Sequence, residues 1–119
     1  MAERITHHGG CHCGSVRWEV DAAVSEVISC NCSICTMRGS LLAFAPVSDF
    51  RLLSGEESLK DYQFGKKRIH HLFCSTCGTE SFGRGTGPNG AEMVAFNVRC
   101  VEGIDLDALP VRHFDGRSL

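Results

Sequence analysis

The sequence lacks several features that would place it in a common functional class. Its 12 Lys and Arg residues face 14 Asp and Glu residues, so the formal net charge is −2 and we expect no general basic surface for nucleic acid. The longest uncharged apolar run, SLLAFAPVS, is too short to span a bilayer. The opening segment, MAERITHHGG, has no apolar core of the kind found in secretory signal peptides. We therefore expect a cytoplasmic protein that binds neither membrane nor nucleic acid.

Several catalytic motifs are also missing. No Ser–His–acid set and no pair of carboxylates stands out in the sequence. The glycine-rich segment GRGTGPNG (83–90) lacks the lysine and the following helix of a phosphate-binding loop, and we interpret it as a hairpin turn. The basic segment KKRIHH (66–71) could attract an anionic thiol such as glutathione, although we favour a solvated hairpin tip.

The spacing of apolar residues predicts a mainly β protein. A length of 119 residues without a linker or repeat predicts a single domain over residues 1–119. The segment SVRWEV (15–20) alternates apolar and polar residues, which is typical of a half-buried strand. Other β-prone segments lie at 24–29, 41–47, 49–55, 59–64, 68–73, 79–85 and 91–100, and one helical turn is expected at 106–110. Strands at this regular spacing predict antiparallel sheets that are coiled or sandwiched.

Eight cysteines stand out in a chain expected to reside in the reducing cytosol, where disulfides are rare. Seven of them form tight groups, CHC at 11–13, CNCSIC at 30–35 and CSTC at 74–77, while Cys100 stands alone. Cysteines one or two positions apart are poorly placed to bond to each other but can converge on one metal ion. We therefore predict metal sites. Zinc suits such sulfur-rich sites best, with iron as the alternative.

The first and last groups predict one closed site. The segment GGCHCG places Cys11 and Cys13 in a glycine-rich turn just before a strand, and FCSTCG places Cys74 and Cys77 in a turn just after one. Glycines allow each turn to curl until both sulfurs point the same way. Two such turns can complete a tetrahedral site with four thiolates, the usual form of structural zinc.

The CNCSIC segment supplies only three thiolates, from Cys30, Cys32 and Cys35. The alternatives for a fourth ligand are His12, His70, His71 and Cys100. We interpret the histidines as surface or packed side chains, with only one of the adjacent pair facing inward, and the cysteine as a buried free thiol. The simplest arrangement leaves the fourth position to water or substrate, which is the pattern of a catalytic zinc.

Four segments together resemble one known family, the glutathione-dependent formaldehyde-activating enzymes, which includes the domain of centromere protein V. These segments are GGCHCGSVRWEV, CNCSICTMRGSL, FCSTCGTESFG and NVRC with EGIDLDALPVRHFDG, so the resemblance spans Gly10 to Gly116. It implies a fold of several coiled β-sheets holding two zinc ions. It also implies a structural zinc on Cys11, Cys13, Cys74 and Cys77, and a catalytic zinc on Cys30, Cys32 and Cys35.

The resemblance further implies a reaction. The family joins glutathione to formaldehyde to give S-hydroxymethylglutathione, which is a carbon–sulfur lyase reaction run in the direction of addition. The expected partners are thus a small thiol and a small aldehyde. The alternative function is a zinc-stabilised module that binds a small molecule or a protein without catalysis. The fourth coordination position of the metal at CNCSIC distinguishes the two functions. A fourth ligand supplied by the protein favours the binding module, whereas a position open to exchange favours the enzyme.

Overall fold

The computed structural model describes residues 3–87 and 89–118. Two β-sheets dominate it, which confirms the prediction of a mainly β fold. The strands in chain order are β1 (Ile5–Gly10), β2 (Arg17–Ala22), β3 (Val27–Cys30), β4 (Leu42–Pro46), β5 (Phe50–Ser54), β6 (Leu59–Tyr62), β7 (Ile69–Cys74), β8 (Phe82–Thr86), β9 (Glu92–Asn97) and β10 (Val111–Phe114). One short α-helix, α1 (Ser33–Arg38), follows β3. Among the described residues, no helix is long and apolar enough to cross a membrane.

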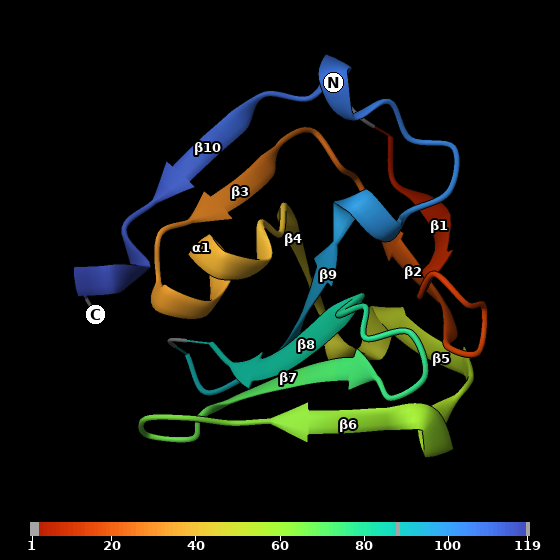
Figure 1. The fold of residues 1–119 in the computed structure, drawn as a ribbon. Helices are drawn as coiled ribbons and strands as arrows, with labels where there is room; N and C mark the ends of the chain where they lie inside the picture. Colours follow the sequence, from red (N-terminus) through yellow and green to blue (C-terminus); the bar gives the residue numbers. More distant parts are fainter. Residues whose placement is uncertain (1–2, 88, 119) are drawn as a thin grey trace.

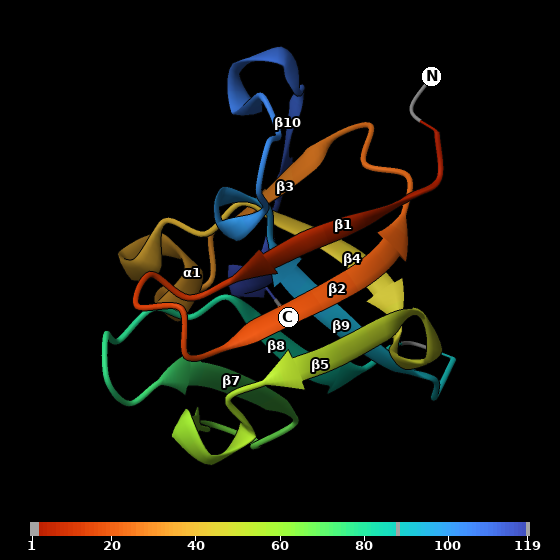
Figure 2. The ribbon, with the colours of Figure 1, turned by 90° about the vertical axis from the view of Figure 1, so that its right-hand side faces the viewer.

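The two sheets differ in size and meet face to face. The small sheet has the order β1-β2-β5 and is antiparallel throughout. The large sheet has the order β10-β3-β4-β9-β8-β7-β6 and curls so that α1 lies between β3 and β8 (Figure 1). Figure 2 shows the small sheet lying across β4 and β9 of the large one. The coil of the large sheet thus creates an inner face on which α1 rests.

The core fills the space between the sheets. Trp18 on β2 is fully buried and packs against Phe50 and Phe96, with ring centroids 5.4 and 5.9 Å away. Phe50 in turn contacts Phe82, at 4.7 Å between centroids. The indole Nε1 of Trp18 donates a hydrogen bond of 3.0 Å to the hydroxyl of Ser81, so the polar atom is satisfied inside the core. This core fixes the ends of β2 and β8, next to which the cysteine turns lie.

One strand pair departs from the expected antiparallel arrangement. β10 runs parallel to β3, with Val111 opposite Val27 and Phe114 opposite Cys30. Parallel neighbours require a long connection, and the chain provides one because the segment between β3 and β10 traverses the rest of the large sheet. The sequence pattern did not predict β10, whose four residues are all exposed and therefore do not alternate.

Two further elements were not predicted, β1 and α1. The expected helical turn at 106–110 is present as a 3₁₀ turn over Leu106–Ala108. The hairpin between β6 and β7 is also present, with Lys67 in a left-handed conformation at φ 55°. The predicted turn at 87–90 includes Pro88, which lies outside the described residues, although β8 and β9 on either side of it pair antiparallel.

Candidate metal centres

Four cysteines from distant parts of the chain form the first cluster. The Sγ atoms of Cys11, Cys13, Cys74 and Cys77 all lie within 4.8 Å of one another. The first two lie in the turn between β1 and β2, and the last two lie at the end of β7 and in the turn that follows. Gly78 adopts φ 82°, and its N–H donates a hydrogen bond of 2.8 Å to the carbonyl of Cys74, which closes that turn. The two glycine-flanked turns therefore meet as the spacing predicted.

The sulfur geometry of this cluster fits a tetrahedral metal ion. The Sγ of Cys13 lies 3.6 Å from that of Cys11 and 3.7 Å from that of Cys74. A tetrahedron with zinc–sulfur bonds of about 2.3 Å has sulfur–sulfur edges of roughly 3.8 Å. A disulfide would require about 2.05 Å, and all four cysteines are free thiols.

Neighbouring groups help the four-sulfur cluster to carry negative charge. The N–H of Val16 donates to the Sγ of Cys11 at 3.3 Å, and the N–H of Thr76 donates to the Sγ of Cys74 at 3.4 Å. A hydrogen bond from the Thr79 side chain, with help from its backbone, lowers the pKa of Cys77 to about 5. Burial has the opposite effect on Cys11 and raises the pKa of its thiol. A bound cation would offset that cost of burial.

The second cluster is local in sequence and has three sulfurs. Cys30 ends β3, Cys32 precedes the first turn of α1 and Cys35 lies within it, and their Sγ atoms are within 4.8 Å of one another. The short helix brings the last two together, because the N–H of Thr36 bonds to the carbonyl of Cys32 at 2.9 Å. Gly39 ends the helix at φ 67° and bonds to the carbonyl of Cys35 at 2.9 Å.

The start of α1 also affects the acidity of these thiols. Burial opposes ionisation of Cys32 most strongly, yet hydrogen bonds from the N–H groups of Cys35 and Ile34 bring its pKa below the usual value. The pKa of Cys35 is raised, first by burial and then by its hydrogen bond to Cys32. A bound cation would stabilise the three sulfurs as thiolates. Thiolates are ligands that zinc binds well.

None of the alternative fourth ligands joins the three-sulfur group among the described residues. Cys100 is half-buried and lies instead near the four-sulfur cluster, where burial, with added repulsion from Cys11 and Cys77, raises its pKa to about 11. His12 is exposed in the first cysteine turn. His70 faces away and its Nδ1 lies 2.5 Å from a carboxylate oxygen of Asp61.

His71 differs from its neighbour His70 because it is buried and faces the inside of the coiled sheet, as expected for one of the two. Its Nδ1 lies 2.9 Å from the carbonyl oxygen of Tyr62, and the Phe64 ring stacks on it with centroids 5.4 Å apart. A carbonyl can only accept, so Nδ1 carries the hydrogen and Nε2 is the free nitrogen in the neutral ring. His71 lines the same cavity as Cys30, Cys32 and Cys35.

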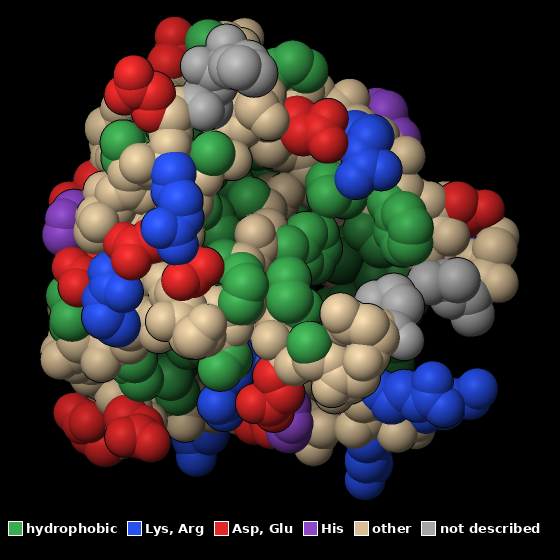
Figure 3. Space-filling view, turned by 180° about the vertical axis from the view of Figure 1, so that it is seen from behind, with side chains coloured by type: hydrophobic (Ala, Val, Ile, Leu, Met, Phe, Trp, Pro, Cys, Tyr) green, Lys and Arg blue, Asp and Glu red, His purple; other side chains and the backbone are tan. Residues whose placement is uncertain are grey.

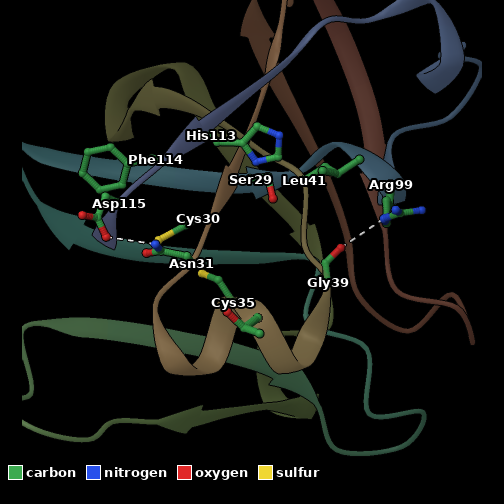
Figure 4. A pocket seen from close by; sticks show the side chains of 11 residues that line it. Ser29, Cys30, Asn31, Cys35, Gly39, Leu41, Arg99, His113, Phe114 and Asp115 are labelled. Atoms are coloured by element: carbon green, nitrogen blue, oxygen red, sulfur yellow. Dashed lines mark hydrogen bonds between the residues drawn. The ribbon is translucent and has the colours of Figure 1, made fainter. Parts of the chain in front are cut away.

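The three-sulfur cluster lies between two cavities, and Cys30 and Cys35 contribute to the walls of both. The smaller cavity, of about 550 Å³, is drawn in Figure 4, and its lining includes the polar side chains of Asn31, Arg99 and Asp115. Asn31 there donates a hydrogen bond of 2.9 Å to Asp115, while the Nε of Arg99 donates one of 3.1 Å to the carbonyl of Gly39. The larger cavity, of about 1190 Å³, lies along the inner face of the large sheet.

Sequence reasoning missed most of the residues around these cavities. Arg99 lies in the turn after β9, and His113 and Asp115 lie at the end of β10 and directly after it. Glu80, which forms an ion pair with Arg38 and lines the larger cavity, follows the second cysteine turn. Only the pairing of β3 with β10 and the position of α1 bring them near the sulfurs. No spacing rule links such residues, whereas His71 was one of the four alternatives considered for a fourth ligand.

Comparison with known proteins agrees with the cysteine pattern. A family model described as "Glutathione-dependent formaldehyde-activating enzyme" matches residues 6–111. The chain is also similar to a Rhodobacter sphaeroides protein whose crystal structure was determined as a structural genomics target. That similarity has a TM-score of 0.76 and 35% sequence identity, and it covers 88% of this chain and 99% of the other. The chain belongs to the glutathione-dependent formaldehyde-activating enzyme family.

Proposed function

We propose that this protein is a metal-dependent enzyme of the carbon–sulfur lyase type that joins glutathione to formaldehyde at Cys30, Cys32 and Cys35. Family membership supports this class of reaction. The observation that carries the proposal is the three-sulfur cluster itself, which has no fourth protein ligand among the described residues and opens to two cavities. A substrate thiol can complete such a set, whereas the four-sulfur cluster is already complete.

Zinc is the metal we propose for both clusters, one ion in each. When bound at Cys30, Cys32 and Cys35, it would lower the pKa of an incoming thiol and keep its sulfur available as a thiolate. The four-sulfur cluster of Cys11, Cys13, Cys74 and Cys77 would hold a structural ion that takes no part in the reaction.

The smaller cavity offers partners for the polar groups of the thiol substrate. Glutathione carries two carboxylates and several amide groups, so it needs cationic and hydrogen-bonding partners next to the sulfur site. Arg99 and His113 line this cavity together with Asn31, within the same walls as Cys30 and Cys35 (Figure 4). The guanidinium of Arg99 retains donor groups beyond the Nε bonded to Gly39, and these can bind a carboxylate.

His71 is the group we propose for proton transfer. Its Nε2 can accept the proton that the thiol loses, because Nδ1 already donates to Tyr62. The thiolate sulfur then bonds to the aldehyde carbon, the π electrons of the carbonyl move to oxygen, and Nε2 returns the proton to that oxygen. Atoms and charge balance without any other reactant. The structure separates this residue from His70, which is already paired with Asp61.

The test is the rate of exchange between free formaldehyde and its glutathione adduct, measured by NMR at fixed pH and thiol concentration. The uncatalysed reaction is fast, so each variant is compared with wild type at equal protein concentration. Cys35→Ser should remove the acceleration. His71→Gln should lower it by about 10²-fold while both metals remain bound, because general acid–base catalysis contributes on that scale.

His70→Gln is the matched control, since it changes the adjacent histidine on the opposite face of β7 and should leave the rate unchanged. Equal rates for wild type and Cys35→Ser would contradict the proposed enzyme and favour a binding module. An unchanged rate in His71→Gln would contradict only the proton-transfer role.

A further inference from the structure

The larger cavity is far more extensive and more apolar than formaldehyde requires. Its volume is about 1190 Å³, and it adjoins all three cysteines of the proposed reaction site. Figure 3 shows a hollow on the rear face of the molecule whose floor consists largely of hydrophobic side chains. A substrate with a single carbon and oxygen would leave nearly all of this surface in contact with water.

Small residues in the middle of the large sheet create the hollow. Across the inner face, Gly83 of β8 lies opposite Ala95 of β9, and Gly85 lies opposite Met93 one step further along. Gly83 and Ala95, which both line the cavity, therefore leave this strip of the sheet without bulky side chains. An added Cβ at Gly83 would come within 2.7 Å of the carbonyl oxygen of His70, so no larger residue fits there.

Larger apolar side chains form the walls of this strip. Phe44 lies on the strand next to Ala95, and Ile69 lies next to Gly85 on the other side. Phe44 is 48% exposed, Ile69 is 53% exposed and Phe114, near the cysteines, is 43% exposed. Exposed apolar side chains that gather around one hollow mark a binding site for an apolar group. We refer to this strip and its walls as the apolar groove.

The length of the apolar groove suits an alkyl chain that begins at the cysteines. The cavity is lined by Asn97 at the cysteine end of β9 and by Thr86 of β8, which pairs with Glu92 of β9. Asn97 and Glu92 are five residues apart, which corresponds to about 16 Å along a strand. A six-carbon chain is shorter than that. The smaller cavity, which has Cys30 and Cys35 in its walls as well, remains free for the glutathione part of the same molecule.

We propose that the apolar groove binds the carbon chain of an alkyl aldehyde, so that the protein accepts glutathione adducts of apolar aldehydes as well as that of formaldehyde. This inference rests on the proposed function for its chemistry. The reaction is unchanged, since the sulfur bonds to the aldehyde carbon and the carbonyl oxygen takes up the thiol proton. Only the group on that carbon differs, and it lies along Gly83 and Ala95.

The experiment uses S-methylglutathione and S-hexylglutathione as unreactive mimics of the two adducts. Binding to the metal-loaded protein is measured by calorimetry and by the NMR signal of the Ala95 methyl group, assigned with an Ala95→Gly variant. Burial of each CH₂ strengthens binding by roughly fourfold. S-hexylglutathione should therefore bind at least about tenfold more tightly, even if only two CH₂ groups are fully buried, and it should shift the Ala95 signal.

Two variants change the apolar groove in opposite ways. Ala95→Phe fills it and Phe44→Ser removes a wall, so both should abolish the advantage of the hexyl compound without weakening binding of the methyl compound. The second variant changes an exposed side chain, which keeps the test valid if the first does not fold. Leu53→Ser, at a side chain of 56% exposure on β5 of the small sheet, is the control and should retain the full advantage.

The two hypotheses fail in different ways. Equal binding of both compounds by wild type, or a hexyl advantage that survives Ala95→Phe and Phe44→Ser, would overturn the apolar groove. Catalysed exchange of formaldehyde can still be observed in that case. A hexyl advantage that depends on the apolar groove, without any acceleration of formaldehyde exchange relative to Cys35→Ser, would support the groove as a ligand site and overturn the proposed reaction.

Discussion

The two cysteine clusters use the same donor atom but differ in how the chain brings the sulfurs together. The four-sulfur cluster joins residues 61 positions apart and connects the turn of the small sheet to the end of β7 in the large one. The three-sulfur cluster lies within six residues and involves only β3 and the start of α1. Cys11 and Cys74 in the first are buried, whereas all three cysteines of the second are half-buried and line cavities.

This difference is the one expected if the four-sulfur cluster stabilises the fold and the three-sulfur cluster reacts with substrate, as we propose. A metal that joins distant segments reduces the entropy of the unfolded chain, and its binding energy adds to folding. A metal held within six residues closes almost no loop and so contributes little to the overall fold. A structural metal ion does not need to be accessible from a cavity. A catalytic metal ion does, because the substrate must reach it.

Cys74→Ala should have the largest effect of any single change. Its side chain is fully buried, and its loss leaves three charged sulfurs around an incomplete site. We expect destabilisation by several kcal/mol, with loss of the metal from this cluster. Urea unfolding together with metal analysis tests this. A variant with an unchanged midpoint and full metal content would remove the structural role of the cluster.

Cys35→Ser should affect metal content more than stability. Three ligands bind a metal less tightly than four, so two thiolates and a hydroxyl should release about one metal equivalent per chain. The protein should remain folded, because the four-sulfur cluster is intact. Metal analysis and circular dichroism provide the measurement. Unfolding of the variant, or retention of both metals, would show that the two clusters do not divide the roles as we propose.

Cobalt substitution should show which cluster accepts a thiol. Charge-transfer bands from thiolate to cobalt report the number of sulfur ligands, and glutathione should raise their intensity at one site only. The increase should be absent in Cys35→Ser, because the three-sulfur cluster no longer holds the ion. An equal increase in that variant would place thiol binding elsewhere in the protein and contradict the open site.

The cysteine pattern and most strands could be predicted because their signals are local. Alternation of apolar and polar residues, as at Val16, Trp18 and Val20, indicates a strand with one buried face. Glycine next to paired cysteines indicates a tight turn. α1 was missed since its six residues contain no buried position and hence no helical periodicity. β1 was missed because ITHHGG places exposed and small residues where apolar ones usually stand.

The cavities could not be predicted, since they depend on strand register and not on spacing. Gly83 and Ala95 lie opposite each other only because β8 pairs with β9 in one register, and a shift of β8 by one residue would turn Gly83 to the other face of the sheet. The parallel position of β10 likewise depends on the course of the whole large sheet. The sequence therefore indicated which cysteines gather into clusters that could hold a metal, but not what surrounds them.

Cys100→Ala should have the smallest effect of these changes, and it tests whether Cys100 belongs to the four-sulfur cluster. Cys100 lies near that cluster without being one of its ligands, so both metals should remain bound and stability at neutral pH should change by about 1 kcal/mol. Burial raises the pKa of its thiol to about 11, above the ordinary value of 9.0.

The folded state therefore disfavours ionisation of Cys100. The contribution of the neutral thiol to the free energy of unfolding is fully present below pH 9 and is lost as the pH rises to about 11. Wild type should become less stable relative to Cys100→Ala over that interval, which urea unfolding at pH 8 and pH 10.5 can measure. A parallel pH dependence of the two proteins would show that the thiol is not buried as described. Loss of a metal from Cys100→Ala would instead make Cys100 a ligand, and the four-sulfur cluster would then no longer be closed by its own four cysteines.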